Sequence, residues 1–511
     1  MTSATVVVSG VERLGLVAAA LLAGAALLAP STRGRALATA AALVLTPLLL
    51  VAHIWNGEQL HALRERPLVV GAGAAVALAA VALAAIALSR RPSAVVLVAL
   101  VAIPFRVPLH VAGTTANLLL PLYFVIAAGC LARVVRGLRA PPRERATPAG
   151  PLEWVLAAVV AVYAAQAAYS VDFDTAIQHV AFFYVPFLLL FALVAEAPWT
   201  RALQARCVAV LAGLGVLFCA VGAVEYATRS VLLNQKLMTH NAYSPSFRVN
   251  SLFYDPNIYG RFLVVVMLVV AAVIAHAHDR RRLAAGAVLL AVLWTGLVTS
   301  LSESSVGALL VGLVTLAAIQ VRVPRAVAAV AATAVVALLA LAVALPPLLG
   351  AGSGPVSLHR VTSGRSDLVR GGAELFAERP LQGWGSGSFA EEYRDQRKGR
   401  SRAAVSASHT TPLTVAVEQG MIGLALYTAL LVAAARLTLA GAPRSATTAA
   451  IAAVLVALVF HSLLYAAFLE EPLLWAFLGA AVGVRAATAP GRAAVRRDPG
   501  ERPAAAAAAA P

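Results

Sequence analysis

Long apolar runs recur along almost the whole chain, with short polar segments between them. Each run has about 18 residues or more, which is enough for a helix to cross about 30 Å of hydrocarbon. The pattern therefore predicts an all-α fold, a polytopic transmembrane helix bundle with about 13 to 15 spans. The expected spans cover about residues 14–32, 36–54, 68–89, 93–110, 117–133, 152–170, 178–196, 203–225, 257–276, 283–300, 304–320, 326–347, 412–435, 447–468 and 471–486.

Two polar segments interrupt this pattern and divide the chain into regions. Residues 1–346 are expected to form N-terminal transmembrane helices, with an outer loop at 225–256. Residues 347–411 are expected to form a large extracytoplasmic loop with short interfacial helices, followed by C-terminal transmembrane helices at 412–486. Residues 487–511, rich in Pro, Arg and Ala, are typical of a disordered cytoplasmic tail. The first apolar run lacks a small-residue cleavage site, so we expect a membrane span there and not a removable signal peptide.

Composition agrees with a membrane protein, since 61% of the 511 residues are hydrophobic and only 12% are charged. The net charge of +17 would suggest a nucleic-acid partner in a soluble protein. Here the arginines stand in short loops between spans, where the positive-inside rule places them on the cytoplasmic side. We therefore expect no nucleic-acid partner and a multi-pass protein of the inner or plasma membrane. The three cysteines, Cys130, Cys207 and Cys219, lie in or beside apolar runs and imply neither a disulfide framework nor a metal site.

Most spans lack an ionisable residue near their middle, and the polar chemistry gathers in three outer segments, at 236–261, 299–305 and 359–418. In the first segment, Pro256 suits the first turn of a helix and Asp255 suits its N-cap. Arg248 would then lie just outside the helix N-terminus, where a guanidinium and backbone amides can hold a phosphate together. The alternative is that Asp255, Pro256 and Asn257 only cap the helix, with Arg248 a solvated loop residue.

The third segment opens with three arginines, Arg360, Arg365 and Arg370. From Arg365 onward, helical spacing places Leu368, Leu375 and Phe376 near one apolar side, which predicts an interfacial helix. The glycine-rich stretch at 383–387 predicts a tight turn around Trp384. As a phosphate-binding loop the stretch is a weak match, because the Lys and the Ser or Thr of a P-loop are missing. A plain turn with an interfacial Trp is an equal alternative.

His409 stands at the end of this segment, next to an apolar run. An imidazole titrates near neutral pH and is well suited to take a proton from a hydroxyl. A lone histidine is also often structural, and this alternative stays open. Glu418 lies about two and a half helical turns further on, where it either orients His409 or packs against the loop.

Taken together, the three segments resemble the O-antigen ligase and O-antigen polymerase superfamily of membrane glycosyltransferases. The likeness covers roughly residues 90–470, in the order, spacing and topology of its motifs. It is carried by Arg248 with Asp255-Pro256-Asn257, by Gly364-Arg365, by the Pro380-Leu381-x-Gly383-x-Gly385 turn, and by His409 with Glu418, Gly420 and Gly423. Two positions depart from the family pattern. Thr410 follows the histidine where Asn, Ser or Gln is usual, and Glu303 stands in a segment where many members carry an Arg.

This resemblance implies transfer of a glycan from a polyprenyl diphosphate-linked donor to a hydroxyl of a glycan or lipid acceptor on the outer membrane face, in contact with membrane lipid. The reaction would proceed with inversion and without a metal or other cofactor. Arg248 and Arg365 would stabilise the leaving diphosphate, and His409 would act as general base. Further substrate-binding candidates are Arg360, Arg370, Asn257, Glu418 and Trp384.

The sequence does not separate a ligase from a polymerase, since both use the same class of donor. A transporter or flippase of lipid-linked oligosaccharide is the rival from another functional class. It predicts inverted repeats and polar breaks at mid-membrane, and the His409 segment has no second copy in the chain. A purely structural membrane scaffold would leave the clustered outer arginines unexplained.

Overall fold

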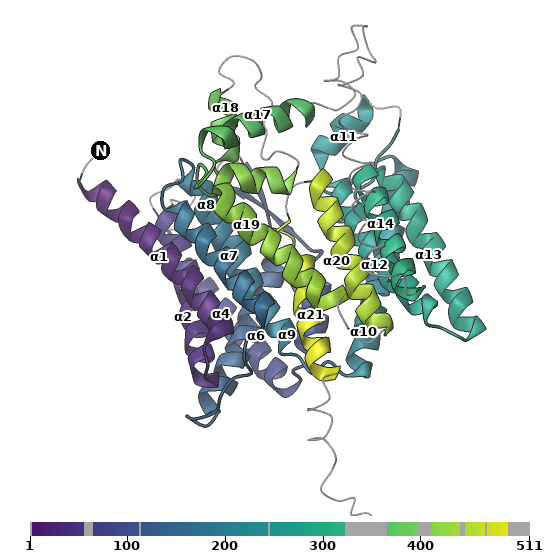
Figure 1. Cartoon of the computed structure of the whole chain (residues 1–511), viewed down its shortest axis with the longest axis horizontal. Helices are drawn as coiled ribbons and strands as arrows, with labels where there is room; N and C mark the ends of the chain where they lie inside the picture. The colour runs from purple at the N-terminus through teal and green to yellow at the C-terminus, as the bar shows by residue number, and fades with distance from the viewer. Residues whose placement is uncertain are drawn as a thin grey trace, which may run out of the picture.

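The computed structural model describes residues 3–55, 65–111, 114–243, 246–321, 365–396, 410–439, 445–465 and 468–488. Within these ranges, 11 helices are long and apolar enough to cross a membrane. They run up and down beside one another in a single bundle (Figure 1). The protein is therefore a multi-pass helical membrane protein, as the apolar pattern predicts.

The membrane-length helices follow one another along the chain. They are α1 (Ser3–Leu28), α2 (Thr32–Ile54), α4 (Pro67–Arg90), α6 (Leu120–Arg139), the run of α8 (Phe173–His179), π-helical η1 (Val180–Tyr184) and α9 (Val185–Ala195), then α10 (Arg201–Thr228), α12 (Pro256–Ala275), α13 (Arg280–Ser300), α14 (Glu303–Gln320), α19 (Thr411–Leu439) and α20 (Ala446–Leu464). Two shorter apolar helices, α7 (Pro151–Ala167) and α21 (Pro472–Thr488), complete the described part of the bundle.

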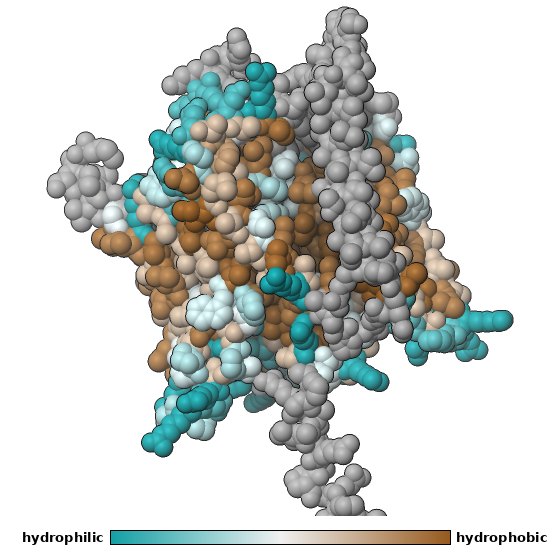
Figure 2. Space-filling view, in the orientation of Figure 1, coloured by the Kyte–Doolittle hydropathy of each residue, from teal (hydrophilic) through white to brown (hydrophobic). Residues whose placement is uncertain are grey.

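The two ends of the bundle differ in character. We term the end that carries α11 (Gln235–Ala242), α17 (Arg365–Glu378) and α18 (Phe389–Gln396) the loop end, and it is uppermost in Figure 1. The opposite end, termed the arginine end, carries hydrophilic groups at the foot of the bundle (Figure 2). The arginines at helix termini on this end are Arg90, Arg136, Arg139, Arg201, Arg280, Arg281, Arg282, Arg436 and Arg485. The predicted division into basic and other loops thus coincides with the two ends of the fold.

The prediction of one span over residues 93–110 was wrong. Helix α5 (Ala94–Ala102) has only 9 residues, and a hairpin of β1 (Val107–Val111) and β2 (Thr114–Leu118) follows it. The strands are antiparallel, with Val107 opposite Leu118. Proline explains the break, since Pro104 and Pro108 lack the amide hydrogen that a continuing helix needs. This hairpin is the exception to the all-α prediction among the described residues.

The interfacial helix predicted in the third outer segment is present as α17, which runs across the loop end (Figure 1). Its buried side chains Leu368 and Leu375 pack with Phe389 and Tyr393 of α18 and with Val417 of α19. The predicted span at 326–347 and the predicted tail at 487–511, apart from its first two residues, lie outside the described residues.

Candidate active site

Helix α19 is broken at Gly420, and the break sets the geometry of the loop end. Gly420 has φ +64°, in the left-handed region that favours glycine. The amide of Met421 after the break donates to the carbonyl of Pro380, at 2.8 Å. Figure 1 shows the first part of α19 lying across the top of the bundle before the helix descends. The residues next to His409 therefore lie at the loop end and not within the bundle.

The glycine-rich turn at 383–387 fits against this break. The amide of Trp384 donates to the carbonyl of Val417 at 3.0 Å, and that of Gly385 donates to the carbonyl of Glu418 at 2.8 Å. A Cβ on Gly383 would stand 2.5 Å from the Glu418 carbonyl oxygen, so only glycine fits there. The interpretation as a turn is confirmed. A phosphate-binding role for these two amides is excluded, because α19 already occupies both.

Glu418 is buried, with 4% of its surface exposed, and links three helices. Its carboxylate accepts a hydrogen bond from the Tyr163 hydroxyl of α7 at 2.8 Å and one from the Phe389 amide of α18 at 3.4 Å. Glu418 therefore packs against the loop through Phe389. The alternative, that Glu418 orients His409, stays a prediction because His409 lies outside the described residues. The Trp384 indole donates to the Leu375 carbonyl at 2.9 Å, and the Arg379 guanidinium lies 3.9 Å from the centre of its ring.

The first outer segment begins α12 as predicted. The Asp255 carboxylate caps the helix by accepting from the Asn257 amide at 2.6 Å, with Pro256 in the first turn. The Tyr465 hydroxyl donates to the other Asp255 oxygen at 3.1 Å. Burial raises the pKa of Tyr465, and the nearby Asp255 adds to this, so the phenol stays protonated and able to donate.

The structure brings the first two outer segments into contact. Arg248 Nε donates to the carbonyl of Ser300, the last residue of α13, at 3.2 Å. Ser302 Oγ donates to the side-chain oxygen of Asn257 at 2.9 Å. Arg248 and Asn257, both predicted site residues, are therefore fixed to the same end of α13 and α14.

The third segment approaches the same place through α20. Thr410 Oγ1 donates to the Leu463 carbonyl at 3.2 Å, near the end of α20. Two residues earlier on this helix, His461 Nε2 lies 3.2 Å from Ser304 Oγ at the start of α14. The residue beside His409 and the first turn of α14 are thus both attached to the last turn of α20.

The other predicted arginines and His409 either lie in α17 or fall outside the described residues. His409 and Arg360 lie outside the described residues, and Arg365 is the first residue of α17. Arg370 is exposed and forms an ion pair of 3.1 Å with Glu374, one helical turn further along α17. Nothing within the described ranges brings Arg370 to Arg248.

Sequence reasoning missed a charged cluster below Asp255. Arg261 of α12 pairs with Glu471, which precedes α21, and both side chains are more than nine-tenths buried. Arg106, between α5 and β1, is close enough for the charges of Glu471 and Arg261 to act on it. One signal was available, since an ionisable residue inside an apolar run, as Arg261 is, marks a functional position by default. Its partner could not be found from pattern alone, because Glu471 is 210 residues away.

A family model described as O-antigen ligase matches residues 287–428. No curated protein matches the chain. The matched range leaves out Arg248 and Asn257 and includes the other predicted site residues, Arg360, Arg365, Arg370, Trp384, His409 and Glu418.

Proposed function

We propose that this chain, which matches an O-antigen ligase family model over residues 287–428, is a membrane glycosyltransferase that moves a glycan from a polyprenyl diphosphate-linked donor to an acceptor hydroxyl. The observation that carries the proposal is the domain match, which contains His409 and Arg365 together. The contacts of Arg248 with Ser300 and of Asn257 with Ser302 support it, because both serines lie within the matched range.

In the proposed reaction, His409 takes the proton of the acceptor hydroxyl as that oxygen attacks the anomeric carbon of the donor sugar. The bond between this carbon and the diphosphate oxygen breaks on the opposite face, so the configuration inverts. The bonding electron pair leaves with the polyprenyl diphosphate. Arg248 and Arg365 stabilise the developing charge in place of a metal ion, because fixed guanidinium groups match phosphate oxygens in both charge and geometry.

The contacts of Arg248 suit this role. Its Nε is held by the Ser300 carbonyl, while its two terminal nitrogens bond none of the described residues and stay available to phosphate oxygens. In the Asn257 side chain, the oxygen accepts a hydrogen bond from Ser302. The side-chain nitrogen bonds none of the described residues and can donate to the substrate. Arg360 and Arg370 are further substrate-binding candidates. We assign Trp384 and Glu418 to holding the turn at 383–387 and the first part of α19, because their polar groups are bonded to the protein.

The loop end would face the outside of the inner or plasma membrane. The arginines gather at the other end, and the positive-inside rule places that end in the cytoplasm. An active site at the loop end is then open to the membrane-embedded donor on one side and to an acceptor from the outer compartment on the other.

The test compares wild type with His409→Ala and Arg365→Ala at matched expression, in membranes that lack the endogenous protein. Both variants should lose about 100-fold or more of the glycan transfer, while lipid-linked precursor accumulates on the outer leaflet. Arg394→Ala is the matched control, because Arg394 is an exposed arginine of α18 at the same end. Precursor trapped on the inner leaflet would identify a flippase instead, and unchanged transfer in both variants would refute the site.

A further inference from the structure

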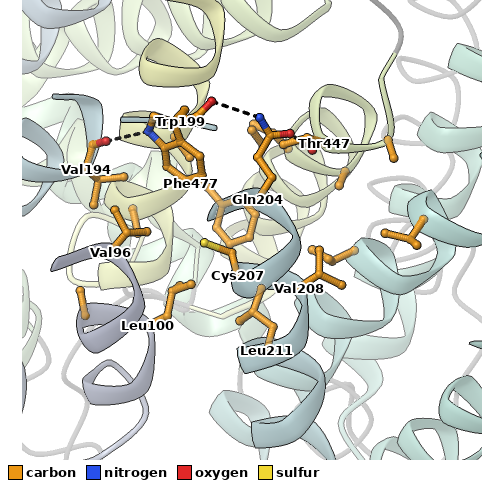
Figure 3. Close-up of a pocket in the computed structure, with 18 of the residues that line it drawn as sticks. Val96, Leu100, Val194, Trp199, Gln204, Cys207, Val208, Leu211, Thr447 and Phe477 are labelled. Carbon is orange, nitrogen blue, oxygen red and sulfur yellow. Dashed lines mark hydrogen bonds between the residues drawn. The ribbon is translucent and has the colours of Figure 1, made fainter. Parts of the chain in front are cut away.

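An apolar pocket opens between helices of the bundle (Figure 3). It lies toward the arginine end, since Gln204 near the start of α10 and Thr447 near the start of α20 line it. Its wall is formed by α5, α10, α12, α20 and α21, with side chains such as Leu100, Cys207, Val269, Ile451 and Phe477. A hydrogen bond of 2.7 Å from Thr447 to Gln204 marks its polar edge. A cavity with this lining suits a hydrocarbon chain and not a sugar.

The charged cluster described above lies nearer to the loop end than this cavity does. Its residues belong to, or directly flank, four of the helices that line the cavity. Arg106 follows α5, Arg261 belongs to α12, Tyr465 follows α20 and Glu471 precedes α21. Along α12, Val269 in the cavity wall is eight residues, or roughly 12 Å, below Arg261. The interior between these helices is therefore charged toward the loop end and apolar toward the arginine end.

Several hydrogen-bond donors in the cluster lack an acceptor. Arg261 Nε and the Tyr123 hydroxyl are buried and have no hydrogen-bond partner among the described residues. Arg106 is half-buried and donates to none of the described residues, although Glu471 lies close enough for its charge to act on the guanidinium. Buried donors of this kind normally have partners, so the cluster is short of acceptors.

The charges of the cluster are also unbalanced. Within the described residues, Arg106 and Arg261 face one carboxylate, that of Glu471, while Asp255 is already engaged by Tyr465 and by the first turn of α12. Burial lowers the pKa of Arg106, and Glu471 offsets part of this. A buried cation without a full counter-charge is costly. An anionic group with several oxygens would supply both the missing negative charge and the missing hydrogen-bond acceptors.

We propose that this interior binds the lipid carrier itself, with a phosphate of the polyprenyl diphosphate held by Arg106, Arg261 and Tyr123 and the isoprenoid tail lying in the cavity below. The identity of the headgroup rests on the proposed function. The site lies outside residues 287–428, so helices before and after this range contribute the carrier site, whereas His409 and Arg365 of the transfer site lie within it. Protein side chains, and not only the surrounding lipid, then contact the isoprenoid tail. The rate of glycan transfer therefore depends on the length of this tail.

The first experiment narrows the cavity and compares two donors that share a headgroup and a glycan. Val208→Phe and Ala480→Leu place larger side chains on the cavity wall. For a long-chain polyprenyl donor, kcat/KM should fall by about tenfold, while for a donor with a short prenyl chain it should stay within about twofold of wild type. Leu310→Phe is the control, since Leu310 is 59% exposed on the outer surface of α14. Equal losses for both donors, or no loss for either, would overturn the proposal.

A binding measurement separates this inference from the proposed function. Wild type and Arg106→Gln, both checked for unchanged thermal unfolding, are titrated in detergent with polyprenyl phosphate, polyprenol and inorganic phosphate. Wild type should prefer polyprenyl phosphate to polyprenol by about tenfold or more, and Arg106→Gln should lose this preference. Protein that binds in this way but transfers no glycan would refute the proposed function alone. Equal binding of the phosphate and the alcohol, or binding of inorganic phosphate as tight as that of the lipid, would refute the carrier site.

Discussion

Arg248 Nε donates a hydrogen bond of 3.2 Å to the carbonyl of Ser300, which ends α13. The carbonyl end of a helix carries partial negative charge and favours a cation there. This contact fixes one edge of the guanidinium, while the two terminal nitrogens bond none of the described residues. It also ties an arginine outside residues 287–428 to a helix within them.

The first prediction concerns this arginine. Arg248→Ala should lower kcat/KM for glycan transfer by about 100-fold, because a fixed donor to the leaving diphosphate is lost. Arg248→Lys should recover only part of the loss, since an ammonium cannot bond Ser300 and a phosphate with the geometry of the guanidinium. Initial rates with purified protein measure both effects. Full activity of the lysine variant would show that charge alone matters.

The second prediction concerns the break in α19. Gly420→Ala should destabilise the protein by about 2 kcal/mol or more, because φ is positive there and a Cβ would collide with the Leu381 carbonyl. Gly213→Ala in α10 is the matched control, since no described atom lies within 4 Å of the place that its new methyl group would take and helical alanine is favourable. Thermal unfolding in detergent compares the two. Similar unfolding temperatures would mean that the turn at 383–387 does not depend on the break.

The third prediction concerns the hydrogen bond of 2.8 Å between Tyr163 and Glu418. Tyr163→Phe and Glu418→Ala should each destabilise the fold by about 1–3 kcal/mol, because each leaves a buried polar group without its partner. The double variant should be less destabilised than the sum of the single ones. Equilibrium unfolding of the four proteins gives the coupling energy, and simple additivity would contradict a direct bond.

The fourth prediction concerns orientation in the membrane. The native cysteines are all buried, so a cysteine added at Arg394 or at Arg282 should be the main reactive thiol. A membrane-impermeant maleimide added to intact spheroplasts should label Arg394→Cys and spare Arg282→Cys until the membrane is opened. The reverse pattern would place the loop end in the cytoplasm and remove the basis for an outer active site.

Much of the fold could be predicted from the sequence because apolar length and helix-start signals are local properties. The expected span at 257–276 matches α12, and Asp255 caps that helix as its sequence indicates. The amphipathic spacing of Leu368 and Leu375 likewise predicted α17. Where the prediction failed, at 93–110, the apolar pattern continued through prolines that end the helix.

The candidate site was less predictable because its contacts join distant parts of the chain. Neither the Arg261–Glu471 pair nor the Tyr465–Asp255 bond has a local signal, since each spans 210 residues. The break at Gly420 also escaped prediction, because a single glycine within an apolar run does not reveal that another segment, here Pro380 to Gly385, will pack against it.

The central claim is that His409 and the arginines of the loop end transfer a glycan from a polyprenyl diphosphate carrier. The most direct measurement is a single-turnover reaction with purified protein in lipid nanodiscs, a polyprenyl diphosphate-linked donor and an acceptor glycan. The account predicts a product with inverted anomeric configuration, one free polyprenyl diphosphate for each glycan transferred, and about 100-fold slower turnover in His409→Ala. A product with retained configuration, or turnover that His409→Ala leaves unchanged, would contradict it.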